Sequence, residues 1–338
     1  MHATSVTVAQ PLKKFFTPHY ILEIQNQNPE YYSNHYYLCH NFILTLFMKQ
    51  FFLFTISFFI PLFAHFLFAQ ETNKEEFSIT FSLENLEITT LSEGQGEGKT
   101  TILLETTPEI ISQTAPTGNF LIATNAFLLK TPRQNILIDA GYGKMLLQNL
   151  KSRNVTPEQI DAILLTHLHG DHIGGLLKNG EIVFPNAELY MAQQEYEYWM
   201  GEHQTTGSDP ARNVIEAYKE KLHLFTTTDI ETGGINILPN VKAIAAHGHT
   251  PGHTAYLMES DTKKMLIWGD LTHAMAVQIP YPEVAVTYDV DPKLAIESRK
   301  KILEYVAIHN IHIAGMHIPF PAVGDIIKED KGYTFKEF

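Results

Sequence analysis

The ten residues THLHGDHIGG, Thr166 to Gly175, place three histidines and an aspartate within six consecutive positions. They follow AILL, residues 162–165, an apolar run that predicts a short buried strand. Alternate residues of an extended chain point the same way, so His167 and His169 are expected to reach one metal ion together. Asp171 and His172 are expected to turn toward a second ion. Imidazole and carboxylate ligands without thiolate suit Zn²⁺, and also Mn, Co or Fe.

Four ligands from one loop cannot complete two ions, so further ligands must come from elsewhere in the chain. Three later segments each place candidate ligands just after an apolar run. The segment AIAAHGHTPGHT contains His247, His249 and His253, LIWGDLTH contains Asp270, and HIAGMHIPFP contains His317.

The overall composition is that of an acidic globular protein. The chain has 338 residues, 44% of them hydrophobic, and a net charge of −13 without a basic cluster. Phosphate binding needs a surface rich in Lys and Arg, so this balance argues against a nucleic-acid partner.

The region around Met48 differs from the rest of the chain. Met48 and Lys49 precede an apolar run, Phe51 to Ala69, and the polar QETNKEE follows, which is typical of a secretory signal peptide. Residues 1–47 are then expected to be an upstream start-site artefact, 48–69 the signal peptide, and 70–338 one periplasmic or secreted domain without membrane contact. An uncleaved anchor is the alternative, although Pro61 and His65 interrupt the run.

The remaining pattern alternates strands and helices and therefore predicts an α/β protein. Strands are expected over 83–91, 125–131, 134–141, 162–165, 187–191, 241–246, 254–259 and 264–268, and helices over 144–153, 193–200, 211–222 and 292–309, with a further helix starting after Thr156. The stretch EGQGEGKTT, Glu93 to Thr101, lacks the first glycine of a phosphate-binding loop and is expected to be a flexible surface loop.

The histidine-rich stretch at 166–175 and the three later segments with His249, Asp270 and His317 form four motifs. Their order resembles that of the metallo-β-lactamase superfamily, and the resemblance extends from Phe77 to Phe338. The resemblance implies a four-layered αβ/βα sandwich with a dinuclear metal site at one sheet edge. It assigns the ligands as His167, His169 and His249 for the first ion, Asp171, His172 and His317 for the second, and Asp270 as the bridge. Asp139, His247 and His253 are then expected to orient these ligands through hydrogen bonds.

Two adjacent metal ions lower the pKa of a shared water and produce hydroxide near neutral pH, so hydrolysis is the predicted reaction. Asp171 is a candidate proton carrier as well as a ligand. The motifs are most similar to the methyl parathion hydrolase and N-acyl homoserine lactonase group. Lactonases of this group often carry Tyr three residues after the bridging Asp, whereas this chain has His273, the residue type of the phosphotriesterase-like branch. His273 could bind substrate, act as an acid, or only orient Asp270.

The sequence therefore predicts a hydrolase of a small-molecule lactone or ester that holds two divalent metal ions. A phosphotriester hydrolase and a non-catalytic periplasmic metal-binding protein are the alternatives. Trp199 is a candidate wall of the substrate cleft, although an aromatic residue on a helix is also a common core residue. A homodimeric assembly is left open.

Overall fold

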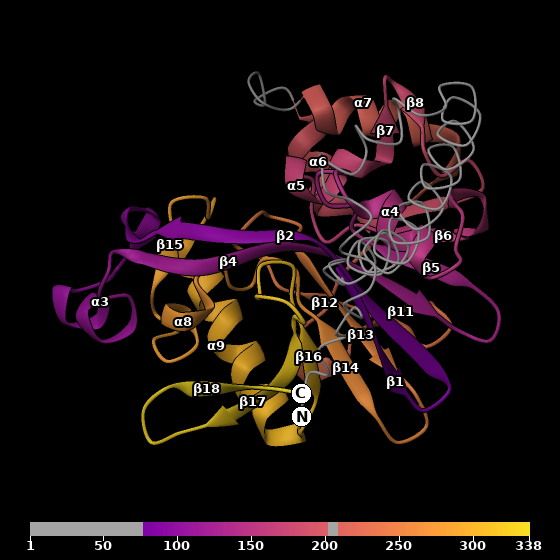
Figure 1. The fold of residues 1–338 in the computed structure, drawn as a ribbon. Coiled ribbons are helices and arrows are strands. Elements are labelled where there is room, and N and C mark those ends of the chain that lie inside the picture. Colours follow the sequence, from indigo (N-terminus) through magenta and orange to yellow (C-terminus); the bar gives the residue numbers. More distant parts are fainter. Residues whose placement is uncertain (1–76, 202–208) are drawn as a thin grey trace, which may run out of the picture. The chain divides into compact units, whose positions relative to one another are not determined.

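Two seven-stranded sheets form the centre of the fold in the computed structural model, which describes residues 77–201 and 209–338 (Figure 1). The first sheet has the order β1 (Ser78–Leu83), β2 (Leu86–Lys99), β4 (Asn119–Lys130), β5 (Asn135–Ile138), β6 (Ala162–Leu164), β9 (Glu188–Ala192) and β10 (Leu222–Phe225). The second has the order β11 (Ile235–Leu238), β12 (Val241–Ala245), β13 (Thr254–Glu259), β14 (Lys264–Ile267), β16 (His312–Ala314), β17 (Val323–Lys328) and β18 (Tyr333–Glu337). The predicted signal peptide and the segment before it lie outside the described residues.

Helices cover the outer faces of both sheets and produce four layers. The largest apolar core joins the two sheets, with Phe127 of β4 and Tyr256 of β13 among its buried residues, and includes Leu303 of α9 (Pro292–His309). A second core packs the other face of the first sheet against α4 (Leu146–Ser152), α6 (Gln193–Met200) and α7 (Asp209–Tyr218). The predicted four-layered αβ/βα sandwich is confirmed.

Several predicted elements have the bounds that their local sequence indicates. The helix α9 begins after Asp291, whose side chain accepts a hydrogen bond from the backbone N–H of Leu294. The helix α6 and the strand β13 also coincide with the predicted ranges. The predicted strand over 83–91 is wrong in one respect, because Glu84 has a φ of 56° and the chain reverses between β1 and β2.

The expected surface loop at Glu93–Thr101 is largely a strand. Residues up to Lys99 belong to β2, which pairs with β4 as far as Lys99 and Asn119. The two strands form a long arm with the helix α3 (Pro108–Thr114) near its end (Figure 1). A small third core that includes Phe120 and Val277 packs this arm against α8 (Met275–Gln278). The arm therefore lies beside the segment that follows Asp270.

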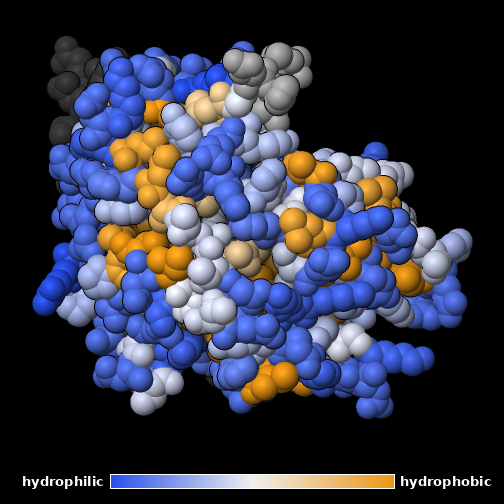
Figure 2. All heavy atoms as spheres, turned by 180° about the vertical axis from the view of Figure 1, so that it is seen from behind, coloured by the Kyte–Doolittle hydropathy of each residue, from blue (hydrophilic) through white to orange (hydrophobic). Residues whose placement is uncertain are grey.

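Short elements complete the described fold. They are β3 (Leu103–Leu104), β7 (Leu177–Lys178), β8 (Glu181–Ile182), β15 (Ala285–Val286), α5 (Gly170–Ile173) and single 3₁₀ turns, one of which, Pro157–Gln159, stands where a helix after Thr156 was expected. Within the described residues, the structure contains no helix with the length and apolarity that a membrane span requires. The face turned away in Figure 1 is largely hydrophilic, with hydrophobic residues in separate small patches (Figure 2).

Candidate metal centre

Four strands end immediately before the predicted ligands. His167 follows β6, His249 follows β12, Asp270 follows β14 and His317 follows β16. Because β14 and β16 are parallel neighbours, their carboxyl ends meet at one edge of the second sheet. The strand ends thus bring residues that are far apart in the sequence to one place.

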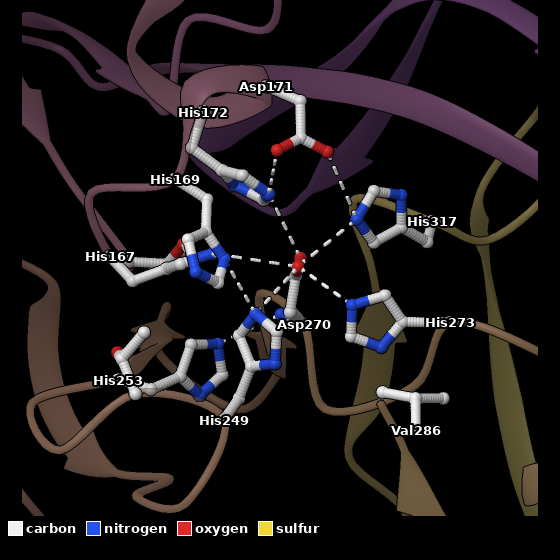
Figure 3. A network of polar contacts seen from close by, with 12 residues as sticks. His167, His169, Asp171, His172, His249, His253, Asp270, His273, Val286 and His317 are labelled. Carbon is white, nitrogen blue, oxygen red and sulfur yellow. Dashed lines mark hydrogen bonds and ion pairs between the residues drawn. The ribbon is translucent and has the colours of Figure 1, made fainter. Parts of the chain in front are cut away.

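All seven predicted ligands lie together there, and their side chains point toward one another (Figure 3). One group consists of His167, His169, His249 and Asp270, and another of Asp171, His172 and His317, with ligand atoms within 4.8 Å of one another in each group. The carboxylate of Asp270 lies between the groups. Its Oδ1 is 3.1 Å from Nε2 of His172 and its Oδ2 is 3.2 Å from Nε2 of His249. A third group, Asp270, His273 and His317, overlaps these two. The geometry is compatible with the predicted two sets and a shared carboxylate, which stay a prediction.

The glycines of the opening motif let this loop pack closely against the loop after β5. A Cβ atom on Gly175 would lie 2.4 Å from the carbonyl oxygen of Ala140, and one on Gly174 would lie 2.9 Å from the backbone of Tyr142. Side chains at these positions would push the ligand loop away from the sheet edge.

Asp139 holds two of the ligand histidines, as predicted. Its Oδ2 lies 2.6 Å from Nδ1 of His172 and also accepts a hydrogen bond from the hydroxyl of Thr166. That hydroxyl lies 3.0 Å from Nδ1 of His167. Because its proton goes to Asp139, the hydroxyl oxygen must accept from Nδ1 of His167. In their neutral form both histidines therefore carry the proton on Nδ1 and present the lone pair of Nε2 to the cluster.

The same reasoning applies to the two ligand histidines of the second sheet. Nδ1 of His317 lies 2.8 Å from the carbonyl oxygen of Ala123, which can only accept. Nδ1 of His249 lies 3.0 Å from Oδ1 of Asp289. Neither Asp289 nor Ala123 was predicted from the amino-acid sequence. Asp289 lies in TYDVD, just before α9, and its single signal was an acidic residue close to a helix start.

His253 orients the bridging residue, as predicted, but His247 has no such contact. Nδ1 of His253 donates to the carbonyl oxygen of Ala246, so its Nε2 accepts the backbone N–H of Asp270 at 2.9 Å. The ring of His247 instead contacts the hydroxyl of Thr227 at 3.0 Å. The prediction that His247 orients a ligand is therefore wrong, because within the described residues its side chain contacts Thr227 and no candidate ligand.

The arrangement of lone pairs fits a metal centre. Nε2 of His167 and Nε2 of His249 lie 2.9 and 3.0 Å from Nδ1 of His169. Tetrahedral zinc with Zn–N bonds of about 2.0–2.1 Å separates its ligand atoms by about 3.3 Å. Buried Nε2 of His172 and Oδ1 of Asp270 also make no hydrogen bond. Without a proton or a cation between them, these acceptors would repel one another, so the donor set suits two divalent cations.

Burial and the charges of the cluster shift the pKa values of its members. Burial lowers the pKa of His169 to about 3 and that of His253 to about 3. Burial also lowers the pKa of His249, but Asp270 and Asp289 outweigh it and raise the value to about 9. Burial opposes ionisation of Asp270, yet the surrounding histidines hold its pKa well below the usual range. The carboxylate is therefore charged, as a bridging ligand must be.

His273 joins the cluster through the bridging residue. Its Nε2 lies 3.1 Å from Oδ2 of Asp270, and its ring stacks on that of His317 with centroids 4.9 Å apart. Burial lowers the pKa of His273 to about 4. The contact with Asp270 is compatible with an orienting role, one of the three considered for His273, which also lies within ligand distance of Asp270 and His317.

A cavity of about 750 Å³ opens beside the cluster. Its lining includes five residues of the cluster, His169, Asp171, His249, Asp270 and His317. The other lining residues include Gly94, Gln95 and Ile122 of the β2–β4 arm, and His273, Tyr142, Lys144 and Tyr288. The exposed Tyr142 and Tyr288 are aromatic residues of this wall that the sequence analysis did not select.

Trp199 is not among the residues that line this cavity, so the prediction that it forms the cleft wall is wrong. Its indole is 8% exposed and belongs to the core beside α7. The indole N–H donates to Oε1 of Glu195 at 2.7 Å, and its ring meets that of His169 edge to face. Trp199 therefore supports a ligand from behind.

Glu195 connects the two ligand loops and was also missed. Its buried carboxylate accepts hydrogen bonds from the backbone N–H groups of Leu168 and Gly252, at 3.0 and 3.1 Å, and from the hydroxyl of Thr250 at 2.6 Å. Nothing in EYEYWM distinguishes this glutamate from its exposed neighbour Glu197.

Comparison with known proteins agrees with this architecture. Residues 120–308 match the metallo-beta-lactamase superfamily. The exodeoxyribonuclease WalJ of Streptococcus pneumoniae is 33% identical over 117 residues, which are 33% of this chain and 41% of that protein. An N-acyl homoserine lactonase of Bacillus cereus is 24% identical over 254 residues, 66% of this chain and 89% of the relative.

Two solved structures share the fold. The hydrolase AbOPH of the beta lactamase superfamily has a TM-score of 0.71 at 29% identity, over 79% of this chain and 99% of its own. AidC, a dizinc quorum-quenching lactonase, has a TM-score of 0.71 at 23% identity, over 78% and 99%. The chain belongs to the metallo-β-lactamase superfamily.

Proposed function

We propose that this member of the metallo-β-lactamase superfamily is a dinuclear-metal-dependent hydrolase that opens lactones or related esters, as its N-acyl homoserine lactonase relatives do by name. One observation carries the proposal. Seven candidate ligands with a shared carboxylate lie together, and five of them, Asp171 and Asp270 included, line an open cavity. A storage site does not need ligands that face a substrate-sized space.

The residues of the cluster would have different roles in the reaction. Bound divalent ions would supply Lewis acidity and an activated water. His167, His169 and His249 would hold one ion, Asp171, His172 and His317 the other, and Asp270 both. The carboxylate of Asp171 is partly exposed, at 21%, and can pass a proton at its Oδ atoms to the leaving oxygen. His273 would keep Asp270 oriented through the contact at Oδ2.

The cavity suits a small molecule with an apolar part. Its volume lies within the range of about 300–1,000 Å³ that is usual for ligand pockets. Ile122, Tyr142 and Tyr288 give it apolar and aromatic surface for an acyl chain or an aryl group. The 117-residue match to WalJ covers 41% of that protein, and a net charge of −13 repels a phosphate backbone, so a nucleic-acid substrate is not proposed.

A phosphotriester is the second candidate substrate, because His273 occupies the position where lactonases of this group often carry Tyr. The imidazole lies against Asp270 and lines the cavity, so it could contact a phosphoryl oxygen as well as orient the carboxylate. Zinc is the metal that the imidazole-rich ligand set favours, with Mn, Co and Fe as alternatives.

The test uses protein loaded with metal, with the metal content measured per chain. We would compare kcat/KM for a series of N-acyl homoserine lactones, an aryl ester and methyl parathion. A preference for lactones that Asp270→Asn abolishes supports the proposal. A preference for methyl parathion favours the second candidate. Two bound metals without activity on any of these compounds contradict both and leave a metal-binding protein.

We also propose that the chain is exported, with translation from Met48 and a mature domain that begins near Gln70. Such a domain has 21 Lys and Arg against 35 Asp and Glu, a net charge of −14. Mass spectrometry of the natural protein would test this, and an N-terminal peptide from upstream of Met48 contradicts it.

A further inference from the structure

The charged side chains that line the cavity are not equivalent. Apart from histidines, the lining contains four of them, Glu93, Lys144, Asp171 and Asp270. The two aspartates belong to the ligand cluster. Of the other two, Glu93 accepts hydrogen bonds from backbone N–H groups. The ammonium group of Lys144 has no carboxylate partner among the described residues.

The carboxylate of Glu93 is occupied by backbone donors. Its Oε2 accepts from the N–H of Tyr142 at 2.7 Å, and its Oε1 accepts from Met145 at 3.1 Å and Leu146 at 3.2 Å. Three donors to one carboxylate neutralise much of its field. Glu93 therefore fixes the loop 141–145 to the arm and is not the partner of Lys144.

The same loop is held from its other side by the metal-ligand loop. Gly143 has a φ of 81°, and a Cβ atom there would lie 2.7 Å from Cα of Gly175. A Cβ atom on Gly141 would lie 2.7 Å from the carboxyl carbon of Glu93. The loop that carries Tyr142 and Lys144 is thus packed on two sides and presents both side chains in a defined position.

Lys144 rests on an aromatic ring and has no carboxylate partner among the described residues. Its Nζ lies 4.8 Å from the centroid of the Tyr142 ring, and in the described part of the chain no carboxylate oxygen lies within 4.0 Å of it. Both side chains are exposed at the cavity. Burial and the charge of Asp171 raise the pKa of Tyr142, which places its hydroxyl within electrostatic range of the cluster. Within residues 77–201 and 209–338, an ammonium group without a carboxylate partner thus lies in the lining of the cavity beside the ligand cluster.

We infer that Lys144 on Tyr142 binds an anionic group of the substrate, so that preferred esters or lactones carry a carboxylate or a similar anion away from the bond that is cut. The inference rests on the proposed function. The acidic net charge of the chain by itself disfavours anionic substrates. A preference for anionic over neutral substrates should therefore depend on Lys144.

The experiment compares kcat/KM for para-acetoxybenzoate, an anion, with that for the neutral para-acetoxybenzamide, using metal-loaded full chain. We expect the anion-to-neutral ratio to fall about three- to fivefold in Lys144→Gln, as for an exposed ion pair, and further in Lys144→Glu. The wild-type ratio should also fall as salt is added, because ions screen exposed charges. Lys151→Gln, an exposed lysine of α4 outside the cavity lining, is the matched control and should keep the wild-type ratio. An unchanged ratio in Lys144→Gln, or an equal fall in Lys151→Gln, overturns the inference.

A binding measurement separates failure of the inference from failure of the proposed function. Benzenesulfonate and its neutral counterpart methyl phenyl sulfone resist hydrolysis, and their Kd values can be measured by calorimetry or NMR. If the chain hydrolyses neither acetoxy ester, activity on the lactone series decides the proposed function, and the ratio of these two Kd values still decides the role of Lys144. A selective loss of benzenesulfonate binding in Lys144→Gln supports the inference, and equal Kd ratios in wild type and variant overturn it.

Discussion

Oδ1 of Asp289 lies 3.0 Å from Nδ1 of His249, and both side chains are buried. The other oxygen of Asp289 accepts the backbone N–H of Val286 at 3.0 Å, which holds the carboxylate in place. Since Nδ1 of His249 donates to Asp289, its Nε2 faces the cluster and is the atom that can bind a metal ion once its proton has left. A residue that is not a ligand thus sets the orientation of one that is.

We expect Asp289→Ala to weaken binding of the metal ion held by His249 by about 10–100-fold, the usual effect of removing such a carboxylate. Competition with a chelator of known affinity measures this directly. Asp325→Ala is the control, because that carboxylate contacts His312 at 2.7 Å and neither residue belongs to the cluster. Wild-type affinity in Asp289→Ala would contradict the prediction.

Glu195 should contribute to stability as well as to the site. Replacement of Glu195 by Leu leaves four donors without their acceptor, those of Leu168, Trp199, Thr250 and Gly252. We expect a loss of about 3–5 kcal/mol in the free energy of unfolding, measured with urea at fixed metal content. Glu197→Leu, at an exposed position of the same helix, should change it by less than about 0.5 kcal/mol. Similar losses in both variants would show that the four hydrogen bonds are unimportant.

The metal-free protein should become less stable as the pH rises from 6.5 to 9. Burial lowers the pKa of His249, but Asp270 and Asp289 outweigh it and raise the value from 6.5 to about 9. Protonated His249 interacts with Asp270 and Asp289 and stabilises the fold. This contribution is fully present below pH 6.5 and is lost as the pH rises through about 9. The Tm of the metal-free wild type should therefore fall more over this range than that of metal-free His249→Gln. Parallel Tm curves for the two proteins would rule this out.

Metal binding should show the opposite trend over the same range. The ion replaces the proton on His249, so the apparent metal affinity should increase from pH 6.5 toward pH 9. Chelator competition at several pH values measures the slope, and Asp289→Asn, which weakens the attraction for the proton, should flatten it. A slope that is equal in the wild type and in Asp289→Asn would contradict this assignment.

Trp199→Ala should lower stability and should not alter the preference for acyl chain length. The indole is buried behind His169 and does not line the cavity, so its removal opens a hole in the core and costs about 3–5 kcal/mol. The kcat/KM values for short-chain and long-chain lactones should fall by equal factors. A selective loss for long chains would restore Trp199 as a wall of the cleft, and Tyr288→Ala provides the comparison with a residue that does line it.

The fold class, seven candidate metal ligands and elements such as α9 could be predicted from the amino-acid sequence and its resemblance to a known family. Their signals are local. His167 to His172 stand in six consecutive positions, and Asp291 caps α9 three residues before the N–H that it accepts. Ligand chemistry, apolar periodicity and capping can all be read within a few residues of chain.

Only the tertiary structure decided what surrounds these ligands. Three of these hydrogen bonds join residues that are far apart in the sequence. The separation is 40 residues for Asp289 and His249, 55 residues for Glu195 and Thr250, and 194 residues for Ala123 and His317. Hydrogen bonds across such sequence separations leave no local pattern. The glycine-rich stretch after Glu93 is a strand because it pairs with β4 along its length, which outweighs its low intrinsic preference for strand. Burial of Trp199 and exposure of Lys144 likewise depend on which surfaces the folded chain brings together, and local sequence does not encode that choice.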